Sequence, residues 1–262
     1  MCMRGDSDGD NMSTHRQIIF AAAALFLYAV SYSWQLDVLP TYLDDIACEQ
    51  LFNASISNQQ CVDAQKSLNL TNNVSKLTND IDVTIDLPFN VIACVAAVAL
   101  VPLSDFVGRK AILAANILLS ATMSIGIALV PHDQFPSVGP WLSGISGFGG
   151  GLFAYLAVTF AFVSDTASRG DVSKRAVLIG RVESACWIGL AVAPIIASAI
   201  ADALAPNVNV LHVQRLMWFP FGVQLLAACI VIFGMRETIQ PGQRGKISWV
   251  RATTIVLSGV PR

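Results

Sequence analysis

The sequence predicts an all-α membrane protein with six transmembrane helices. Of its 262 residues, 54% are hydrophobic and only 13% are charged, and the charges cluster between long uncharged stretches. Soluble domains carry about 25% charged residues. Together with a mean hydropathy of +0.59, these observations exclude a disordered chain, a nucleic-acid-binding protein and a water-soluble globular enzyme.

The lengths of the uncharged stretches indicate where the chain crosses the bilayer. A helix needs about 20 mostly apolar residues to cross a hydrocarbon core of about 30 Å. Six stretches meet this requirement, and they form one bundle over residues 17–235. The expected spans cover residues 17–37, 87–104, 111–131, 138–164, 176–201 and 216–235.

The first span follows an acidic tail, residues 1–16, and is not expected to be a cleaved signal peptide. A signal peptide begins with basic residues and ends at a small-residue cleavage site, and this segment has neither feature. The second span contains Pro88 and Pro102, so a re-entrant segment is the alternative there.

The basic residues set the expected orientation. If the N-terminus is cytoplasmic, only Lys66, Lys76 and Arg215 of the 16 lysines and arginines lie on the outer side. Cytoplasmic loops are enriched in basic residues. We therefore expect both termini in the cytoplasm, with residues 236–262 as a polar linker.

Residues 43–86 form the expected outer loop, which carries three glycosylation sequons that need a luminal or extracellular face. The sequons are at Asn53, Asn69 and Asn73. Cys48 and Cys61 share this loop and its oxidising compartment, so they pair with each other, or one of them pairs with a cysteine outside this chain. The pattern predicts a glycoprotein of the plasma membrane or an endomembrane of a eukaryote.

The turn between the second and third spans brings opposite charges close together. Asp105 ends the second span, Gly108 permits a tight turn, and Arg109 and Lys110 begin the third span. Positive-inside anchoring explains the two basic residues but leaves Asp105 unexplained. The spacing therefore predicts a charged latch at the cytoplasmic end of the bundle.

This turn resembles the signature of the major facilitator superfamily. The signature is a glycine, three residues, then Asp-Arg-x-Gly-Arg and a further basic residue, and the four latch residues match it. Val101 replaces the leading glycine and Phe106 replaces the first arginine. The resemblance implies that this chain is the N-terminal six-helix half of a major facilitator fold, with the C-terminal half missing.

Residues in the fourth and fifth spans extend the resemblance. Asp165 closes the fourth span, and the resemblance implies that it joins the latch as a partner of the arginine. Gly189 and Pro194 are similar to the glycine and proline bend of the family's fifth span. Within the fourth span, the spacing of Gly147 and Gly151 allows close helix packing.

Glu183 is the strongest single candidate for a coupling role, because a carboxylate within a span is costly and by default indicates function. The run from Ser164 to Gly189, which includes Arg175 and Glu183, resembles the proton-coupled folate transporter family. That resemblance implies a protonatable Glu183 that faces the transport cavity. The alternative is a position near the membrane interface on a tilted helix.

Three further polar residues are candidates for lining a cavity. Asp37 ends the first span, and it lines an outer vestibule or faces lipid headgroups. Asn90 and Asn116 lie within the second and third spans. Each lines a cavity or hydrogen-bonds a neighbouring helix, and the residues alone do not decide between these readings.

Together these features favour a secondary active transporter of a small solute, working by alternating access, coupled to protons and present here as a half. No metal and no other cofactor are expected, and the chain has no phosphate-binding Gly-x-x-x-x-Gly-Lys. The expected partners are the lipid bilayer, a small-molecule substrate, protons, and the missing C-terminal half or a second copy; no nucleic acid is expected.

Two alternatives stay open beside the transporter. The first is a truncated, non-transporting membrane protein that binds or regulates a full-length relative. The second is an intramembrane serine protease, suggested by Gly-Ile-Ser146-Gly on the fourth span. The sixth span contains no histidine that could activate the serine, so the chain is not expected to be an enzyme.

Overall fold

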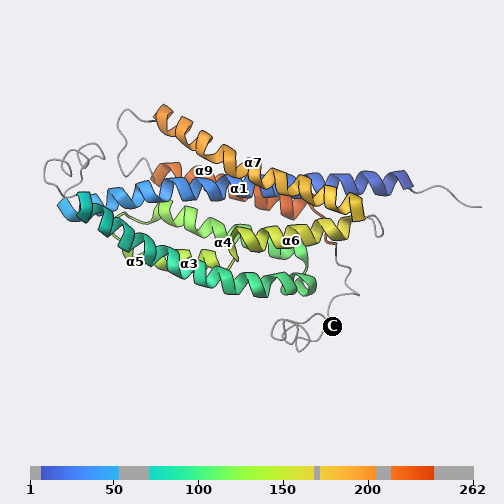
Figure 1. The fold of residues 1–262 in the computed structure, drawn as a ribbon, viewed down its shortest axis with the longest axis horizontal. Coiled ribbons are helices and arrows are strands. Elements are labelled where there is room, and N and C mark those ends of the chain that lie inside the picture. Colours follow the sequence, from blue (N-terminus) through green and yellow to red (C-terminus); the bar gives the residue numbers. More distant parts are fainter. Residues whose placement is uncertain (1–6, 53–70, 168–171, 205–213, 239–262) are drawn as a thin grey trace, which may run out of the picture.

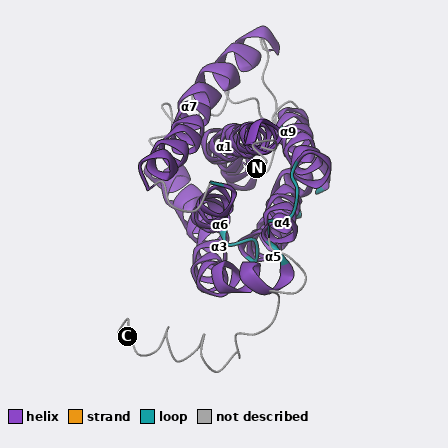
Figure 2. Ribbon diagram, turned by 90° about the vertical axis from the view of Figure 1, so that its right-hand side faces the viewer, coloured by secondary structure: helices purple, strands orange, loops and turns teal. Residues whose placement is uncertain are grey.

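The computed structural model describes residues 7–52, 71–167, 172–204 and 214–238, and the regular structure within them is helical. The elements are α1 (Ser7–Phe52), α3 (Thr71–Val107), α4 (Arg109–Leu129), α5 (Phe135–Gly147), α6 (Gly151–Thr166), α7 (Val172–Leu204), α9 (Trp218–Cys229) and the π-helical η1 (Ile230–Gly234). They run along the long axis of the molecule (Figure 1). The end-on view in Figure 2 shows α1 between α7 and α9, and both of these helices contact α1.

Six helical segments of the described chain are long and apolar enough to cross a membrane. They are Thr14–Cys48, Val74–Val107, Arg109–Leu129, Phe135–Thr166, Val172–Ile200 and Gln214–Gly234. Each contains most of one predicted span, so the predicted fold class, an all-α membrane protein with six transmembrane helices, is confirmed.

The main apolar core lies around α1. Leu25 and Tyr28 of α1 are fully buried, together with Ile117 of α4, Phe162 of α6 and Val182 of α7. The helices differ strongly in how much of their surface the bundle covers. Only 11% of the most apolar window of α3 and 22% of that of α7 are buried, against 61% for α1 and α4. Helices α3 and α7 therefore present the largest uncovered apolar faces.

Helices α1 and α3 continue into the predicted outer loop 43–86. Ile81 and Ile85 of α3 are spaced one helical turn apart and are buried against Tyr42 and Ile46 of α1. Apolar residues at this spacing favour a helix, although the segment is too polar to be read as a span. The structure thus corrects the predicted loop, of which only residues 53–70 lie outside the described chain.

The predicted fourth span, 138–164, is interrupted in its middle. Helix α5 ends at Gly147 and α6 begins at Gly151, and Gly150 and Gly151 have φ angles of 77° and 61°. These left-handed angles are readily adopted only by glycine. A Cβ atom at Gly147 would lie 2.9 Å from the carbonyl oxygen of Phe89 on α3. Gly147 therefore serves close packing as predicted, whereas Gly151 serves the break.

Asn116 of α4 binds the interrupted turn. Its side chain is 2% exposed, and its Nδ2 donates hydrogen bonds to the carbonyl oxygens of Gly149 and, at 3.1 Å, of Gly151. Backbone carbonyls released by a helix break inside a membrane need another donor. Of the two readings open for Asn116, the structure supports the hydrogen bond to a neighbouring helix, and Asn116 does not line the small cavity between α1, α3, α4 and α5.

We expect Asn116→Ala to lower the thermal midpoint of the purified protein by a few degrees. The loss of these bonds should cost about 1 kcal/mol, because interhelical hydrogen bonds contribute about 0.6 kcal/mol on average and an unpaired buried acceptor costs about 1–3 kcal/mol. Asn90→Ala is the control. Asn90 is exposed and bonds only to the Asp86 carbonyl of its own helix, at 2.9 Å. An equal effect of both substitutions would contradict this role of Asn116.

Candidate functional site

The candidate site lies at one end of the bundle, where α3 turns into α4 within a single residue. Gly108 has φ 114° and ψ 138°, and its N–H donates to the carbonyl oxygen of Ser104 at 3.1 Å. A side chain at this φ would be strained. The tight turn places Arg109 in the first turn of α4, only four residues after Asp105 of α3.

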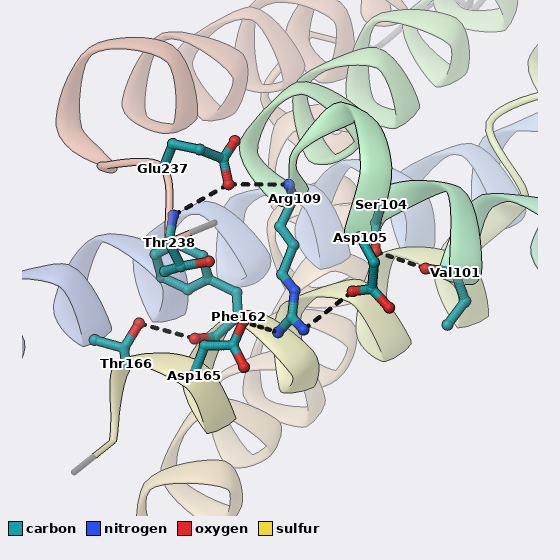
Figure 3. A network of polar contacts seen from close by, with 9 residues as sticks. All are labelled: Val101, Ser104, Asp105, Arg109, Phe162, Asp165, Thr166, Glu237 and Thr238. Carbon is teal, nitrogen blue, oxygen red and sulfur yellow. Dashed lines mark hydrogen bonds and ion pairs between the residues drawn. The ribbon is translucent and has the colours of Figure 1, made fainter. Parts of the chain in front are cut away.

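Arg109 binds two carboxylates from two different helices (Figure 3). Its Nη2 lies 3.2 Å from Oδ1 of Asp105, and its Nη1 lies 2.8 Å from Oδ2 of Asp165 at the end of α6. The contact between Nη1 and Oδ2 of Asp165 is an ion pair. The Arg109 side chain is 11% exposed, and those of Asp105 and Asp165 are 48% and 38% exposed. The sequence-predicted partners are thus brought together around one buried guanidinium.

Glu237 adds a third carboxylate, which the sequence analysis missed. Its Oε1 accepts hydrogen bonds from the backbone N–H groups of Arg109, at 3.2 Å, and Thr238, at 3.1 Å (Figure 3). A carboxylate at a helix N-terminus binds unpaired N–H groups and complements the helix dipole. The chain after the sixth span is thereby attached to the start of α4. The sequence offered one indication of this contact: Glu237 directly follows the sixth span, at the end of the bundle where Arg109 is expected.

Lys110, the fourth predicted latch residue, lies beside this cluster without joining it. It makes no ion pair within the described residues. One helical step separates it from Arg109, which turns its side chain about 100° away around α4. The cluster in the structure consists of Asp105, Arg109, Asp165 and Glu237, and this set is called the inner cluster below.

The sequence matches the family model described as "Sugar (and other) transporter" over residues 22–238, which is most of the chain. This family is part of the major facilitator superfamily, whose signature the latch turn resembles. The chain belongs to this transporter family. It is therefore an integral, multi-pass membrane protein of a transporter family, and this membership argues against the protease alternative.

Solved structures of this transporter superfamily share the fold. The human organic anion transporter MFSD10 (TETRAN) matches with a TM-score of 0.61 and 17% sequence identity. The match covers 92% of this chain and 53% of that one, so the chain spans about half the length of the structure that it matches. No curated protein matches the sequence.

The remaining predicted residues of this family member lie away from the inner cluster. Glu183 is exposed on α7, and its Oε1 accepts a hydrogen bond from Trp187 Nε1 at 3.3 Å. Asp37 on α1 and Asn90 on α3 are exposed, and neither lines the small cavity between α1, α3, α4 and α5. Pro194 is exposed inside α7, which continues through it.

Among the described glycines, Gly189 of the fifth span lies closest to the backbone of another helix. A Cβ atom at Gly189 would lie 2.7 Å from the carbonyl oxygen of Phe26 and 3.0 Å from Cβ of Ala29, both on α1. Next to it, Ser33 Oγ of α1 donates to the carbonyl oxygen of Leu190 at 3.1 Å. Helices α1 and α7 therefore touch backbone to backbone where only glycine fits.

The predicted features of the outer segment are only partly described. Cys48 is disulfide-bonded, whereas Cys61 lies outside the described residues, so their pairing stays a prediction. The sequons at Asn53 and Asn69 lie outside them too. Asn73 is in the first turn of α3, and its use as a glycosylation site also stays a prediction.

Proposed function

We propose that the chain is a six-helix half of a secondary active transporter that moves a small solute by alternating access. The observation that carries this proposal is the inner cluster, in which one buried arginine joins the ends of α3, α4 and α6. Its ion pairs form when this end of the bundle is closed and break when it opens. The free energy of these pairs therefore favours the closed state over the open one. We place this end and both termini in the cytoplasm, as the basic residues favour.

The exposure of the two aspartates limits how strongly the cluster holds. Exposed ion pairs contribute about 0.2–1 kcal/mol each. Two such pairs therefore shift the equilibrium between closed and open states by about tenfold, since about 1.4 kcal/mol corresponds to a factor of ten. A bias of this size suits a gate that must open and close in every transport cycle.

Alternating access requires a second set of helices, because major facilitator transporters bind their solute between two six-helix halves. The uncovered apolar faces of α3 and α7 support contact with a C-terminal half or with a second copy of this chain. The matching structure, which is about twice as long as this chain, also supports it.

The transport proposal is tested by uptake measurements on cells that express the chain, alone and together with a candidate C-terminal half. Sugars are the first solutes to test, because of the family description, and organic anions the second, because of the matching structure. Uptake above that of untransfected cells, and reduced by Arg109→Ala, is expected. If no tested combination transports any solute, or if Arg109→Ala transports like the wild type, the proposal is contradicted.

For the coupling ion we propose a proton that binds Glu183. This carboxylate is exposed on α7, where a second half would cover it. A carboxylate within a span is costly unless it binds a cation. We expect Glu183→Gln to reduce proton-driven solute accumulation at least tenfold and to leave solute exchange at equal pH active. Ser184→Ala is the control, since Ser184 is exposed and bonds only to its own helix, at Gly180. Unchanged pH dependence in Glu183→Gln would rule out this coupling role.

A second candidate function is supported by the match to MFSD10, which covers 53% of that longer chain. A six-helix half can bind a full-length relative in place of that relative's own half and so regulate it. Co-expression then lowers the relative's uptake, and the two proteins co-purify. Absence of co-purification would exclude this alternative.

A further inference from the structure

The break in the fourth span separates two helices that are held in different ways. Helix α5, before the break, is fixed to α3 by close backbone contacts. Ser143 Oγ donates to the carbonyl oxygen of Ile85 at 2.6 Å, and a Cβ atom at Gly147 would lie 2.9 Å from the carbonyl oxygen of Phe89. Because so little space separates the two backbones, α5 and α3 form one unit.

Helix α6, after the break, is attached to α4 by polar contacts at its two ends. Asn116 Nδ2 donates to the carbonyl oxygen of Gly151 at 3.1 Å at one end, and Arg109 pairs with Asp165 at the other (Figure 3). Arg109 and Asn116 are two helical turns apart on α4 and therefore lie on the same face. Asn116 is buried, whereas Asp165 is exposed, and exposed ion pairs are weak. The contact at Asp165 therefore separates more easily than the contact at the break.

The backbone at the break lacks the hydrogen bonds of a continuous α-helix. The N–H groups of Gly149 and Gly150 donate to carbonyl oxygens three residues back, at 3.1 Å and 2.8 Å. Such a stretch inside a helix is typical of a hinge, and glycine adopts new backbone angles at low cost. The large side chains on either side, Phe148 and Phe153, are 58% and 81% exposed. Helix α6 can therefore tilt without forcing these two rings through the core.

We infer that the glycine break is a hinge on which α6 tilts away from α4 when the inner cluster opens, while α5 stays on α3 and Asn116 holds the pivot. The inference rests on the proposed gating by the inner cluster and adds that the half bends at one place. The helix from Gly151 to Asp165 is about 21 Å long. A bend of about 20°, the size of a sharp kink, moves its far end by about 7 Å, which separates Asp165 from Arg109.

Distances between spin labels test the hinge in the whole chain, held in lipid nanodiscs. The labels are attached to a genetically encoded ketone amino acid, so the native cysteines stay unlabelled. One pair joins exposed Phe233 of η1, which contacts α4, to half-buried Ser164 near the end of α6. The reference pair joins Phe233 to exposed Ile145 of α5. Both distances are compared between the wild type and Arg109→Ala, in which the inner cluster loses its cation.

In Arg109→Ala we expect the distance from Phe233 to Ser164 to lengthen by about 7 Å and the distance to Ile145 to stay unchanged. In a Gly151→Ala background the lengthening should be lost, because alanine disfavours the φ of 61° at this position. The site has room for the methyl group, since the nearest atom of another helix is Phe89 Cζ at 3.5 Å. Gly222→Ala, where a Cβ atom has nothing within 4 Å, is the control and should retain the lengthening.

Three results would overturn the hinge. Equal lengthening of both distances would show that the half moves as one rigid body, and no lengthening of either would show that α6 stays fixed. Full lengthening in the Gly151→Ala background would show that the glycine is not needed. The two distances decide the question even if the Gly151→Ala protein does not fold. They require no transport, so their outcome is separate from that of the uptake test of the transporter proposal.

Discussion

Arg109→Ala is expected to reduce solute uptake by the assembled transporter about tenfold. The substitution removes the only group that joins Asp105 and Asp165 in the described structure, and it leaves two carboxylates facing each other without a cation. The like charges then repel, so the closed inner end loses about 1–2 kcal/mol relative to the open one, or about a tenfold change in population. The measurement is solute uptake, together with the labelling rate of a single cysteine placed at this end of the bundle.

Two further variants separate the charge from the shape of Arg109. Arg109→Lys retains one positive charge but loses the planar guanidinium that reaches two carboxylates at once, so partial activity is expected. Lys110→Ala should have a much smaller effect, because Lys110 makes no ion pair within the described residues. Glu237 binds the backbone of Arg109, so its contact survives in each variant. Equal uptake by Arg109→Ala and Lys110→Ala would contradict a gating role for the inner cluster.

Gly189→Ala is expected to cause the largest loss of stability among single-methyl additions in the described helices. The new Cβ would lie 2.7 Å from a backbone oxygen of α1. A backbone atom cannot rotate away as a side chain can, so α1 and α7 must separate. Overpacking of this kind costs about 1–3 kcal/mol, which should lower the thermal midpoint of the purified protein by several degrees.

Gly180→Ala is the matched control for this substitution. Gly180 lies on the same helix, α7, and a Cβ there would have no atom within 4 Å. Alanine is favoured over glycine in a helix by about 1 kcal/mol, so no loss of stability is expected. Should Gly189→Ala melt at the same temperature as Gly180→Ala, the close contact between α1 and α7 would not exist in the membrane.

The residues around the turn between the second and third spans illustrate how far local sequence can predict a site. Asp105 and Arg109 are four residues apart, and a glycine between them permits a tight turn, so their pairing follows from chain geometry. Asp165 is distant in sequence, and its place in the cluster came only from the family resemblance. The position of Glu237 after the sixth span indicated the end of the bundle where it lies, but its partners are backbone N–H groups, which a charge pattern does not reveal.

The break in the fourth span could not be predicted from amino-acid composition. A run of glycines in an uncharged stretch is compatible with a packed helix and with an interrupted one, because both are apolar. Gly147 packs against α3, while Gly150 and Gly151 adopt left-handed angles. The choice depends on Asn116 of another helix, whose amide binds the released carbonyl oxygens.

The sequence by itself determined the six membrane-spanning helices and the charged turn, because the cost of polar groups in lipid and the chain geometry of a tight turn act locally. Only the tertiary structure decided which helices touch and which polar groups meet. Glu183 lies on an uncovered face and Asp86 lines the small cavity between α1, α3, α4 and α5, although both are carboxylates on apolar helices. That difference depends on how each helix is rotated against its neighbours, which packing between distant segments sets.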